Sequence, residues 1–265
     1  MFLSGKTRWQ LSVTNPIIRP DWPVPPGVIA LSTLRQGGRS QAPYDSWNLA
    51  HHVGDDSNAV AANRARLGQC LPAGTAVQWL NQVHGTRVIA GNAKGDCPDA
   101  DACWTREHGV ACAVLTADCL PVLFCSAAGD AVAAAHAGWR GLLAGVLENT
   151  VSAMGVQPGQ LLAWLGPAIS GPAFEVGQEV RAAYLEASSG ALSSALESCF
   201  TPNIDKPGHY FADLYALARL RLAALGVEQV YGGNFCTYTD PARFFSYRRD
   251  GQTGRMASLI LCNSG

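Results

Sequence analysis

The clearest pattern in this chain is a set of three apolar runs near its middle. They read GVACAVLTAD, LPVLFCS and AVAAAHAG, and turn-forming residues separate them. Apolar runs of this length without polar alternation are typical of strands that are buried on both faces. Further strands are expected at VIALSTL, LLAWLGP, QVYGGNFC, FFSYRRD and MASLILC, and two strands around a tight turn are expected at VQWLNQVHG and TRVIAG.

Apolar positions at helical spacing predict helices between these strands. The expected helices span about residues 57–71, 140–155, 176–188 and 213–226. Asp56 or Ser57 is the expected N-cap of the first helix, and Asp213 is the expected N-cap of the last. No repeat or linker divides the chain, so we expect one domain over residues 1–265, with sheets covered by helices.

The composition limits the classes of function. The chain has 265 residues, of which 48% are hydrophobic and 15% are charged, and its net charge is -1. This balance is typical of a compact globular protein, and it indicates neither nucleic acid nor an anionic membrane as a partner. We see no secretory signal and no run approaching about 20 apolar residues, so no membrane span is expected.

The chain contains nine cysteines, an odd number, scattered through apolar runs. This pattern indicates reduced thiols in a cytoplasmic protein rather than a disulfide framework. Ordinary buried thiols are expected at Cys70, Cys112, Cys125, Cys199 and Cys262, because cysteine packs like a small hydrophobic residue. No feature specifies an oligomeric state, and we expect a monomer.

Three residues, His84, Cys119 and His136, stand out as candidates for chemistry. They lie in NQVHG, TADCLP and AHAGWRG, beside turn-forming residues at or near the ends of predicted strands. Two imidazoles and one thiolate suit zinc and leave a fourth position open. The same cysteine and histidine would also make a nucleophile and its base. Taken singly, His84 also fits a surface turn and Cys119 ordinary packing, but the three together favour a reactive site.

A second candidate is an anion site in AHAGWRGLLAGVL. This segment leads from a predicted strand through a glycine-bounded turn into a helix. Free backbone N–H groups at the helix start, together with Arg140, predict a place for phosphate near His136. Arg248 and Arg249 in FFSYRRD add positive charge, and at least one of them is expected to face solvent.

The order of motifs along the chain resembles a known family. The motifs are NLAHHVGDD, NQVHG, DADA, TADCLPVLF, AAAHAGWRGLLAGVLE, LGPAISGPAFEVG, GG-x-x-CTY, FFSYRRD and TGRMAS. Over roughly residues 20–262 they resemble the laccase-domain family, also called the multicopper polyphenol oxidoreductase family. The resemblance implies an α+β fold, a layered α-β-β-α sandwich with mixed sheets that is similar to toxin-type cysteine deamidases.

The resemblance also implies a site and an activity. The family's metal-binding His, Cys and His fall on His84, Cys119 and His136, with zinc as the expected metal and copper as its alternative. Asn48 joins Arg140 and Arg248 as an expected substrate-binding residue. Bacterial members are similar to a purine nucleoside phosphorylase that acts with phosphate on adenosine, inosine and methylthioadenosine and that also has adenosine deaminase activity.

Other functions remain open on the sequence. A cysteine hydrolase that edits cytoplasmic peptidoglycan precursors would use Cys119 as nucleophile and His136 as base. A copper-dependent polyphenol oxidase would need a cluster of further coppers with imidazole ligands, and the chain has only 6 histidines. A purely binding module is disfavoured by three reactive residues beside an anion site.

Overall fold

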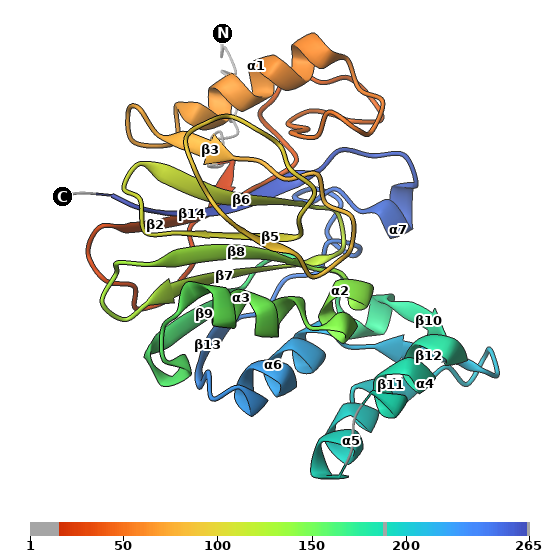
Figure 1. The fold of residues 1–265 in the computed structure, drawn as a ribbon. Helices are drawn as coiled ribbons and strands as arrows, with labels where there is room; N and C mark the ends of the chain where they lie inside the picture. Colours follow the sequence, from red (N-terminus) through yellow and green to blue (C-terminus); the bar gives the residue numbers. More distant parts are fainter. Residues whose placement is uncertain (1–15, 188–189, 264–265) are drawn as a thin grey trace, which may run out of the picture.

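The computed structural model describes residues 16–187 and 190–263, and it places two β-sheets face to face between helices (Figure 1). Helix α1 (Ser57–Gly68) covers the outer face of one sheet. Helices α2 (Trp139–Ala144), α3 (Val146–Met154) and α6 (Leu214–Ala224) cover the outer face of the other. The predicted α-β-β-α layering is confirmed.

The first sheet joins strands from both ends of the sequence. Its order is β1 (Ile17–Ile18), β2 (Val28–Thr33), β14 (Met256–Cys262), β6 (Val110–Thr116) and β3 (Ala76–Gln78). Strand β14 is antiparallel to both of its neighbours, whereas β3 runs parallel to β6. The sheet is therefore mixed, as predicted.

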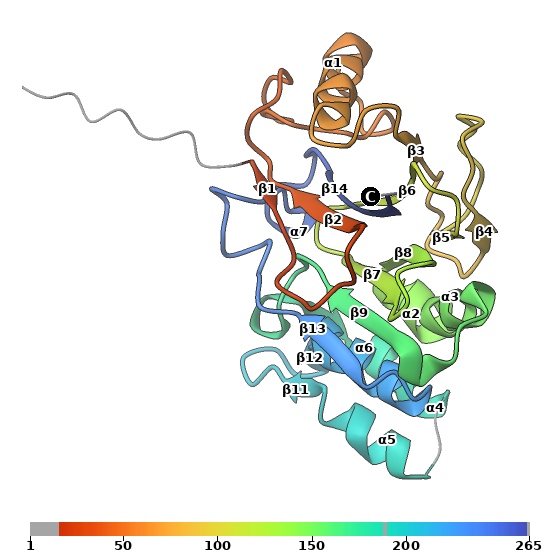
Figure 2. The ribbon, with the colours of Figure 1, turned by 90° about the vertical axis from the view of Figure 1, so that its left-hand side faces the viewer.

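The second sheet carries most of the predicted central strands. Its order is β13 (Gln229–Gly232), β9 (Leu161–Leu165), β7 (Leu120–Ser126), β8 (Val132–Ala137), β5 (Ala102–Thr105) and β4 (Val88–Ala90). A small antiparallel sheet was not predicted; it comprises β10 (Glu175–Gly177), β12 (His209–Ala212) and β11 (Phe200–Pro202). It lies beside α4 (Gln178–Glu186) and α5 (Gly190–Glu197), at the edge of the molecule seen in Figures 1 and 2.

Strand β7 shows why the central runs are continuously apolar. Its side chains at Val122 and Phe124 pack in the core under the helices. Its side chains at Leu123 and Cys125 pack in the core between the two sheets. Successive residues of a strand point to opposite faces, so a strand with a covered face on each side needs apolar residues at every position.

The predicted helix over residues 140–155 is divided into α2 and α3. Gly145 ends the first and begins the second with a φ of 101°, a left-handed conformation that side chains other than glycine rarely adopt. The amphipathic spacing continues across this break, so periodicity alone did not reveal it.

Helix α4 begins two residues later than predicted, because Val176 and Gly177 belong to strand β10. The last residue of the predicted helix, 188, lies outside the described residues.

Two predicted strand assignments were wrong. VQWLNQVHG and TRVIAG do not form a hairpin, because β3 belongs to the first sheet and β4 to the second. The segment FFSYRRD ends in the short helix α7 (Tyr247–Asp250), where the Ser246 side chain caps the turn by accepting from the backbone N–H of Arg249.

Within the described ranges, no helix is both long and apolar enough to cross a bilayer.

Candidate active site

Three segments distant in sequence bring His84, Cys119 and His136 together. His84 lies in the loop between β3 and β4, Cys119 lies where the chain passes from β6 in one sheet to β7 in the other, and His136 is near the end of β8. Their ligand atoms all lie within 4.8 Å of one another, and Cys119 Sγ is 3.9 Å from His84 Nε2. His136 is buried, Cys119 is half-buried and His84 is exposed. The structure thus groups the three residues singled out in the sequence.

The buried carboxylate of Asp101 orients two members of this cluster. It lies 2.8 Å from His136 Nδ1 and accepts the backbone N–H groups of His84 at 2.9 Å and Gly85 at 2.6 Å. These bonds hold His84 in its left-handed backbone conformation, with a φ of 60°. Because Nδ1 of His136 is engaged by Asp101, Nε2 is the ring nitrogen left for the cluster.

The cluster favours ionisation of its thiol. Burial opposes the charged form, but the His136 and His84 imidazoles outweigh it and lower the pKa of Cys119 to about 6. Burial likewise opposes charge on His136, whereas Cys119 and Asp101 raise the pKa of His136 to about 9. Without a metal, Cys119 and His136 therefore form a thiolate–imidazolium pair near neutral pH.

Asp118 fixes the turn that presents Cys119. Its φ is 94°, so the backbone is left-handed at a residue with a side chain. The carboxylate accepts the Thr237 hydroxyl and the Arg248 backbone N–H, each at 2.6 Å, and its carbonyl accepts the Ile169 N–H at 2.9 Å. Segments from three other parts of the chain therefore hold this turn in place.

Gly138 leaves room for the cluster. A Cβ atom at this position would lie 3.0 Å from Cys119 Sγ and 3.1 Å from His84 Cδ2. Gly141 is equally constrained, because a Cβ there would lie 2.8 Å from the Gly85 carbonyl oxygen. The glycines of AHAGWRG therefore permit close approach of α2 to the His84 loop.

The donor set suits a soft divalent metal. Two imidazoles and a thiolate are established zinc ligands, and three protein ligands leave one position open. The bond from His136 to Asp101 supplies the outer carboxylate that metal-bound histidines commonly have. Among the described residues, His84, Cys119 and His136 make the one group of His, Cys, Asp or Glu side chains with this geometry. They are the residues that would hold a metal.

Two cavities adjoin the cluster. The first, of about 400 Å³, includes His52, Gln82 and Arg255. The second, of about 240 Å³, is lined by residues that include Trp139, Arg140, Ile169, Phe174, Leu214 and Arg248. Both cavities include His84, Ala117, Cys119 and Tyr247, so the thiol lies on the boundary between them.

The predicted substrate-binding residues differ in position. Arg140 and Arg248 line the second cavity, where their guanidinium groups lie over the rings of Trp139 at 4.4 Å and Phe174 at 5.1 Å. Asn48 is fully buried and outside both linings, and its carboxamide oxygen accepts the Arg255 backbone N–H at 2.9 Å.

Sequence reasoning missed Asp101, His52 and Arg255. All three lie in motifs that carried the family resemblance, DADA, NLAHHVGDD and TGRMAS. A polar or charged residue inside such a motif is the signal that could have singled them out. Arg249, by contrast, has a structural role, because its guanidinium donates to the carbonyls of Thr237 and Phe244.

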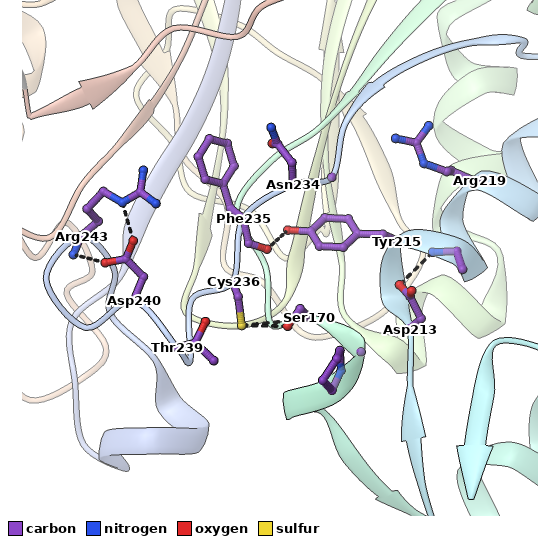
Figure 3. A pocket seen from close by; sticks show the side chains of 14 residues that line it. Ser170, Asp213, Tyr215, Arg219, Asn234, Phe235, Cys236, Thr239, Asp240 and Arg243 are labelled. Atoms are coloured by element: carbon purple, nitrogen blue, oxygen red, sulfur yellow. Dashed lines mark hydrogen bonds and ion pairs between the residues drawn. The ribbon is translucent and has the colours of Figure 1, made fainter.

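A third cavity, of about 760 Å³, lies apart from the cluster and is shown in Figure 3. Its floor includes Cys236, whose Sγ accepts the Ser170 hydroxyl at 2.9 Å. Of its two arginines, Arg219 donates to the carbonyls of Val230 and Gly232, and Arg243 is paired with Asp240, as Figure 3 shows. Cys236 is followed in sequence by Thr237, whose hydroxyl donates to the Asp118 carboxylate. The bond between Ser170 and Cys236 is therefore adjacent to the residue that fixes the Asp118 turn.

Comparison with known proteins gives a consistent assignment. The profile of a family described as multi-copper polyphenol oxidoreductase laccase matches residues 29–263. The purine nucleoside phosphorylase YfiH of Escherichia coli is 52% identical over 245 residues, which cover 92% of this chain and 98% of that protein. A protein of Pseudomonas aeruginosa, also named a purine nucleoside phosphorylase, is 53% identical over 249 residues, or 93% of this chain and 98% of that protein.

Solved structures agree with this assignment. A Neisseria meningitidis protein superimposes with a TM-score of 0.88 at 52% identity, covering 94% of this chain and 100% of that one. YlmD from Geobacillus stearothermophilus gives a TM-score of 0.85 at 32% identity, covering 96% and 98% of the two chains. The fold described above is therefore shared with these proteins.

Proposed function

The chain belongs to the multi-copper polyphenol oxidoreductase laccase family, and we propose that it is a zinc-dependent purine nucleoside phosphorylase. Its substrates are adenosine, inosine and methylthioadenosine, each with inorganic phosphate, and adenosine deaminase activity accompanies the phosphorolysis. Support comes from the relatives named purine nucleoside phosphorylase and from the cluster of His84, Cys119 and His136 between two cavities. The cluster on a boundary between two cavities is the observation that carries the proposal.

Phosphorolysis requires two reactants to meet at one carbon. A phosphate oxygen forms a bond to C1′ of the ribose, the bond from C1′ to N9 breaks, and the base leaves with the bonding electrons and takes up a proton. The protein's contribution is positioning of the reactants and stabilisation of charge. Two cavities that meet at Cys119 provide two places from which reactants can approach a shared centre.

Deamination would use the same cluster. It replaces the exocyclic amino group of adenosine by an oxygen from water and releases ammonia. When bound, zinc supplies Lewis-acid chemistry at this point. Asp101 keeps His136 oriented with Nε2 toward the cluster, and the left-handed turn at Asp118 keeps the Cys119 thiolate beside it.

One observation favours a second candidate, a cysteine hydrolase acting on peptidoglycan precursors. In the absence of metal, Cys119, His136 and Asp101 have the arrangement of a nucleophile, its base and the group that orients the base. The test is alkylation of Cys119 by iodoacetamide. Protection by a wall precursor but not by zinc would favour the hydrolase.

Multi-copper oxidase chemistry is not part of the proposal, despite the family's name. Of the remaining histidines, His52 lines the first cavity and His209 is paired with Glu175 at 2.7 Å. The described residues therefore offer one three-ligand group rather than the several imidazole-rich sites of a laccase. Copper stays an alternative occupant of that single group.

Product analysis tests the proposal directly. Zinc-loaded protein is incubated with adenosine or inosine, with and without phosphate, and the products are separated by HPLC. We expect free base only with phosphate, inosine from adenosine without phosphate, and loss of both in Cys119→Ala. Cys70→Ala, which removes a half-buried thiol just beyond the end of α1, is the matched control and should keep both activities. Absence of phosphate-dependent base release in the wild type would overturn the proposal.

A further inference from the structure

We propose that inorganic phosphate binds in the first cavity, against Arg255, and that the purine base lies in the second cavity, between Trp139 and Phe174. This assignment rests on the proposed phosphorylase function and deepens it. It moves the phosphate from Arg140, where the sequence analysis expected it, to the other cavity that Cys119 lines.

Arg255 is a half-buried cation without a partner of opposite charge. Its guanidinium makes no ion pair with a carboxylate anywhere in residues 16–187 and 190–263. Nη1 donates to the carbonyls of Thr253 at 2.8 Å and Gly254 at 3.0 Å, and Nε and Nη2 have no hydrogen-bond acceptor among the described residues. Attraction between opposite charges strengthens as water is excluded, so an anion entering this cavity gains more from Arg255 than from an exposed cation.

The Arg255 backbone is held as firmly as its side chain. Its N–H donates to Asn48 Oδ1 at 2.9 Å, and the Asn48 amide nitrogen in turn donates to Asp55 at 2.8 Å and to the Ala50 carbonyl at 3.0 Å. A guanidinium fixed before the anion arrives loses little conformational entropy on binding. Asn48, predicted to touch substrate, is on this assignment a positioning residue for Arg255.

The first cavity contains no carboxylate in its lining, whereas the second includes Asp118. His52 and Tyr247 in this lining are hydrogen-bonding groups suited to phosphate oxygens. Gln82, in the same lining, is bonded to the Leu115 backbone, to which its amide nitrogen donates at 2.8 Å and from which its oxygen accepts at 2.7 Å. Outside the cluster of His84, Cys119 and His136, Arg255 is the one Asp, Glu, Lys or Arg side chain among the described residues of this lining, so its charge is complementary to an anion.

Arg140 is less suited to phosphate. It is exposed, and its guanidinium lies over the Trp139 ring, 4.4 Å from the centroid. The helix that begins beside it, α2, has only 6 residues, too short for the strong N-terminal dipole that the sequence suggested. Phosphate at Arg140 would also lie in the cavity that Asp118 lines.

The second cavity has the walls expected for a purine. The indole ring of Trp139 and the ring of Phe174 line it together with the apolar side chains of Ile169 and Leu214. The guanidinium groups of Arg140 and Arg248 lie over these rings, at 4.4 Å from Trp139 and 5.1 Å from Phe174, and a base stacks on a guanidinium plane as well as on an aromatic ring. The cavity volume of about 240 Å³ matches a group of nucleobase size rather than a polymer.

The two cavities share lining residues, so a phosphate in one and a base in the other can both reach the ribose between them. Displacement at C1′ brings the phosphate oxygen to one face of the carbon while the base departs from the other. With the base beside Phe174 and phosphate at Arg255, the ribose lies across the shared boundary formed by His84, Cys119 and Tyr247. The products are ribose 1-phosphate on one side and the free base on the other.

Steady-state kinetics with inosine and inorganic phosphate test the assignment. We expect Arg255→Gln to raise the KM for phosphate about 10- to 100-fold, the loss associated with one charge-assisted hydrogen bond. The KM for inosine should change less than about 3-fold, and Arg255→Lys, which keeps the charge, should recover part of the phosphate affinity. Arg243→Gln, in the third cavity, is the matched control and should leave both constants unchanged.

The results distinguish a wrong position for phosphate from the absence of phosphorylase activity. A rise in the KM for phosphate in Arg140→Gln but not in Arg255→Gln would overturn it. Equal rises for both substrates in Arg255→Gln would show a general structural role and would also overturn it. If the wild type releases no base, the proposed function fails, and calorimetric titration of phosphate into wild type and Arg255→Gln still decides whether Arg255 binds the anion.

Discussion

The carboxylate of Asp101 bonds to Nδ1 of His136 at 2.8 Å and to the backbone N–H of His84 at 2.9 Å. One buried side chain thus sets the ring orientation of one candidate metal ligand and the backbone conformation of another. His84 has a left-handed φ of 60°, which residues other than glycine rarely adopt, so this carboxylate supports a conformation that the cluster needs.

Asp101→Asn should weaken metal binding more than its small change in size suggests. The amide cannot accept from His136 and both backbone N–H groups as a carboxylate does, so one of these donors is left unsatisfied. We expect zinc affinity to fall about 10- to 100-fold, measured by competition with a chromophoric chelator. Asp99→Asn changes an exposed neighbour and serves as control; equal affinity in the two variants would contradict the role given to Asp101.

Alkylation of metal-free protein should report the ionisation of Cys119. Because its pKa is lowered to about 6, the thiolate predominates above that pH, and the rate of reaction with iodoacetamide should rise through pH 6 and level off by about pH 7. Replacing His136 by Gln removes the principal stabilising charge and should move the rise toward pH 8 or above. Mass spectrometry of the Cys119 peptide gives the rate.

Cys125 provides an internal comparison in the same experiment. Burial raises the pKa of this thiol to about 12, so it should not react below pH 9 while the protein is folded. Labelling of Cys125 together with Cys119 would indicate unfolding rather than selective ionisation. A rise of Cys119 labelling only above pH 8 would contradict the proposed thiolate–imidazolium pair.

Gly138→Ala should damage the cluster while sparing the core. The added methyl group would meet Cys119 Sγ at 3.0 Å and the His84 ring at 3.1 Å, so one of them must move. We expect turnover to fall about 10-fold, because the required shift is a fraction of the 1 Å misplacement that can cost about 100-fold. Gly159→Ala, where nothing lies within 4 Å of the new atom, should retain full turnover.

Thr237→Val should destabilise the turn that carries Cys119. The Thr237 hydroxyl and the Asp118 carboxylate are both buried and lie 2.6 Å apart, and valine leaves one carboxylate oxygen without its donor. The expected loss is about 1–3 kcal/mol in the free energy of unfolding, measured by urea denaturation. Thr201→Val, on an exposed strand, should differ from wild type by less than about 0.5 kcal/mol.

The sequence predicted the elements whose pattern is set by burial on both faces. Strands β6, β7, β8 and β14 are recognisable because every position faces either the other sheet or a helix. The division of residues 140–155 at Gly145 and the short helix α7 were not recognisable. Each depends on one backbone conformation or one capping bond rather than on a repeated pattern.

The candidate site was only partly recognisable. His84, Cys119 and His136 are chemically distinctive in their segments, so residue type alone identified them. Asp101 and Arg255 are ordinary charged residues in sequence, and their importance comes from burial and from which groups they meet. Asn48 was expected to touch substrate, whereas its contact with the Arg255 backbone can be seen only in three dimensions.

The place of β14 between β2 and β6 has a consequence for synthesis on the ribosome. These three strands are adjacent in the sheet, yet residues 34–109 separate β2 from β6, and β14 follows β6 by more than a hundred positions. A nascent chain can form β7, β8 and the segments that carry His84, Cys119 and His136 long before residues 256–262 emerge. Until then the position between β2 and β6 in the first sheet stays unoccupied. Arg255, the residue before β14, is the last residue of the site to be synthesised.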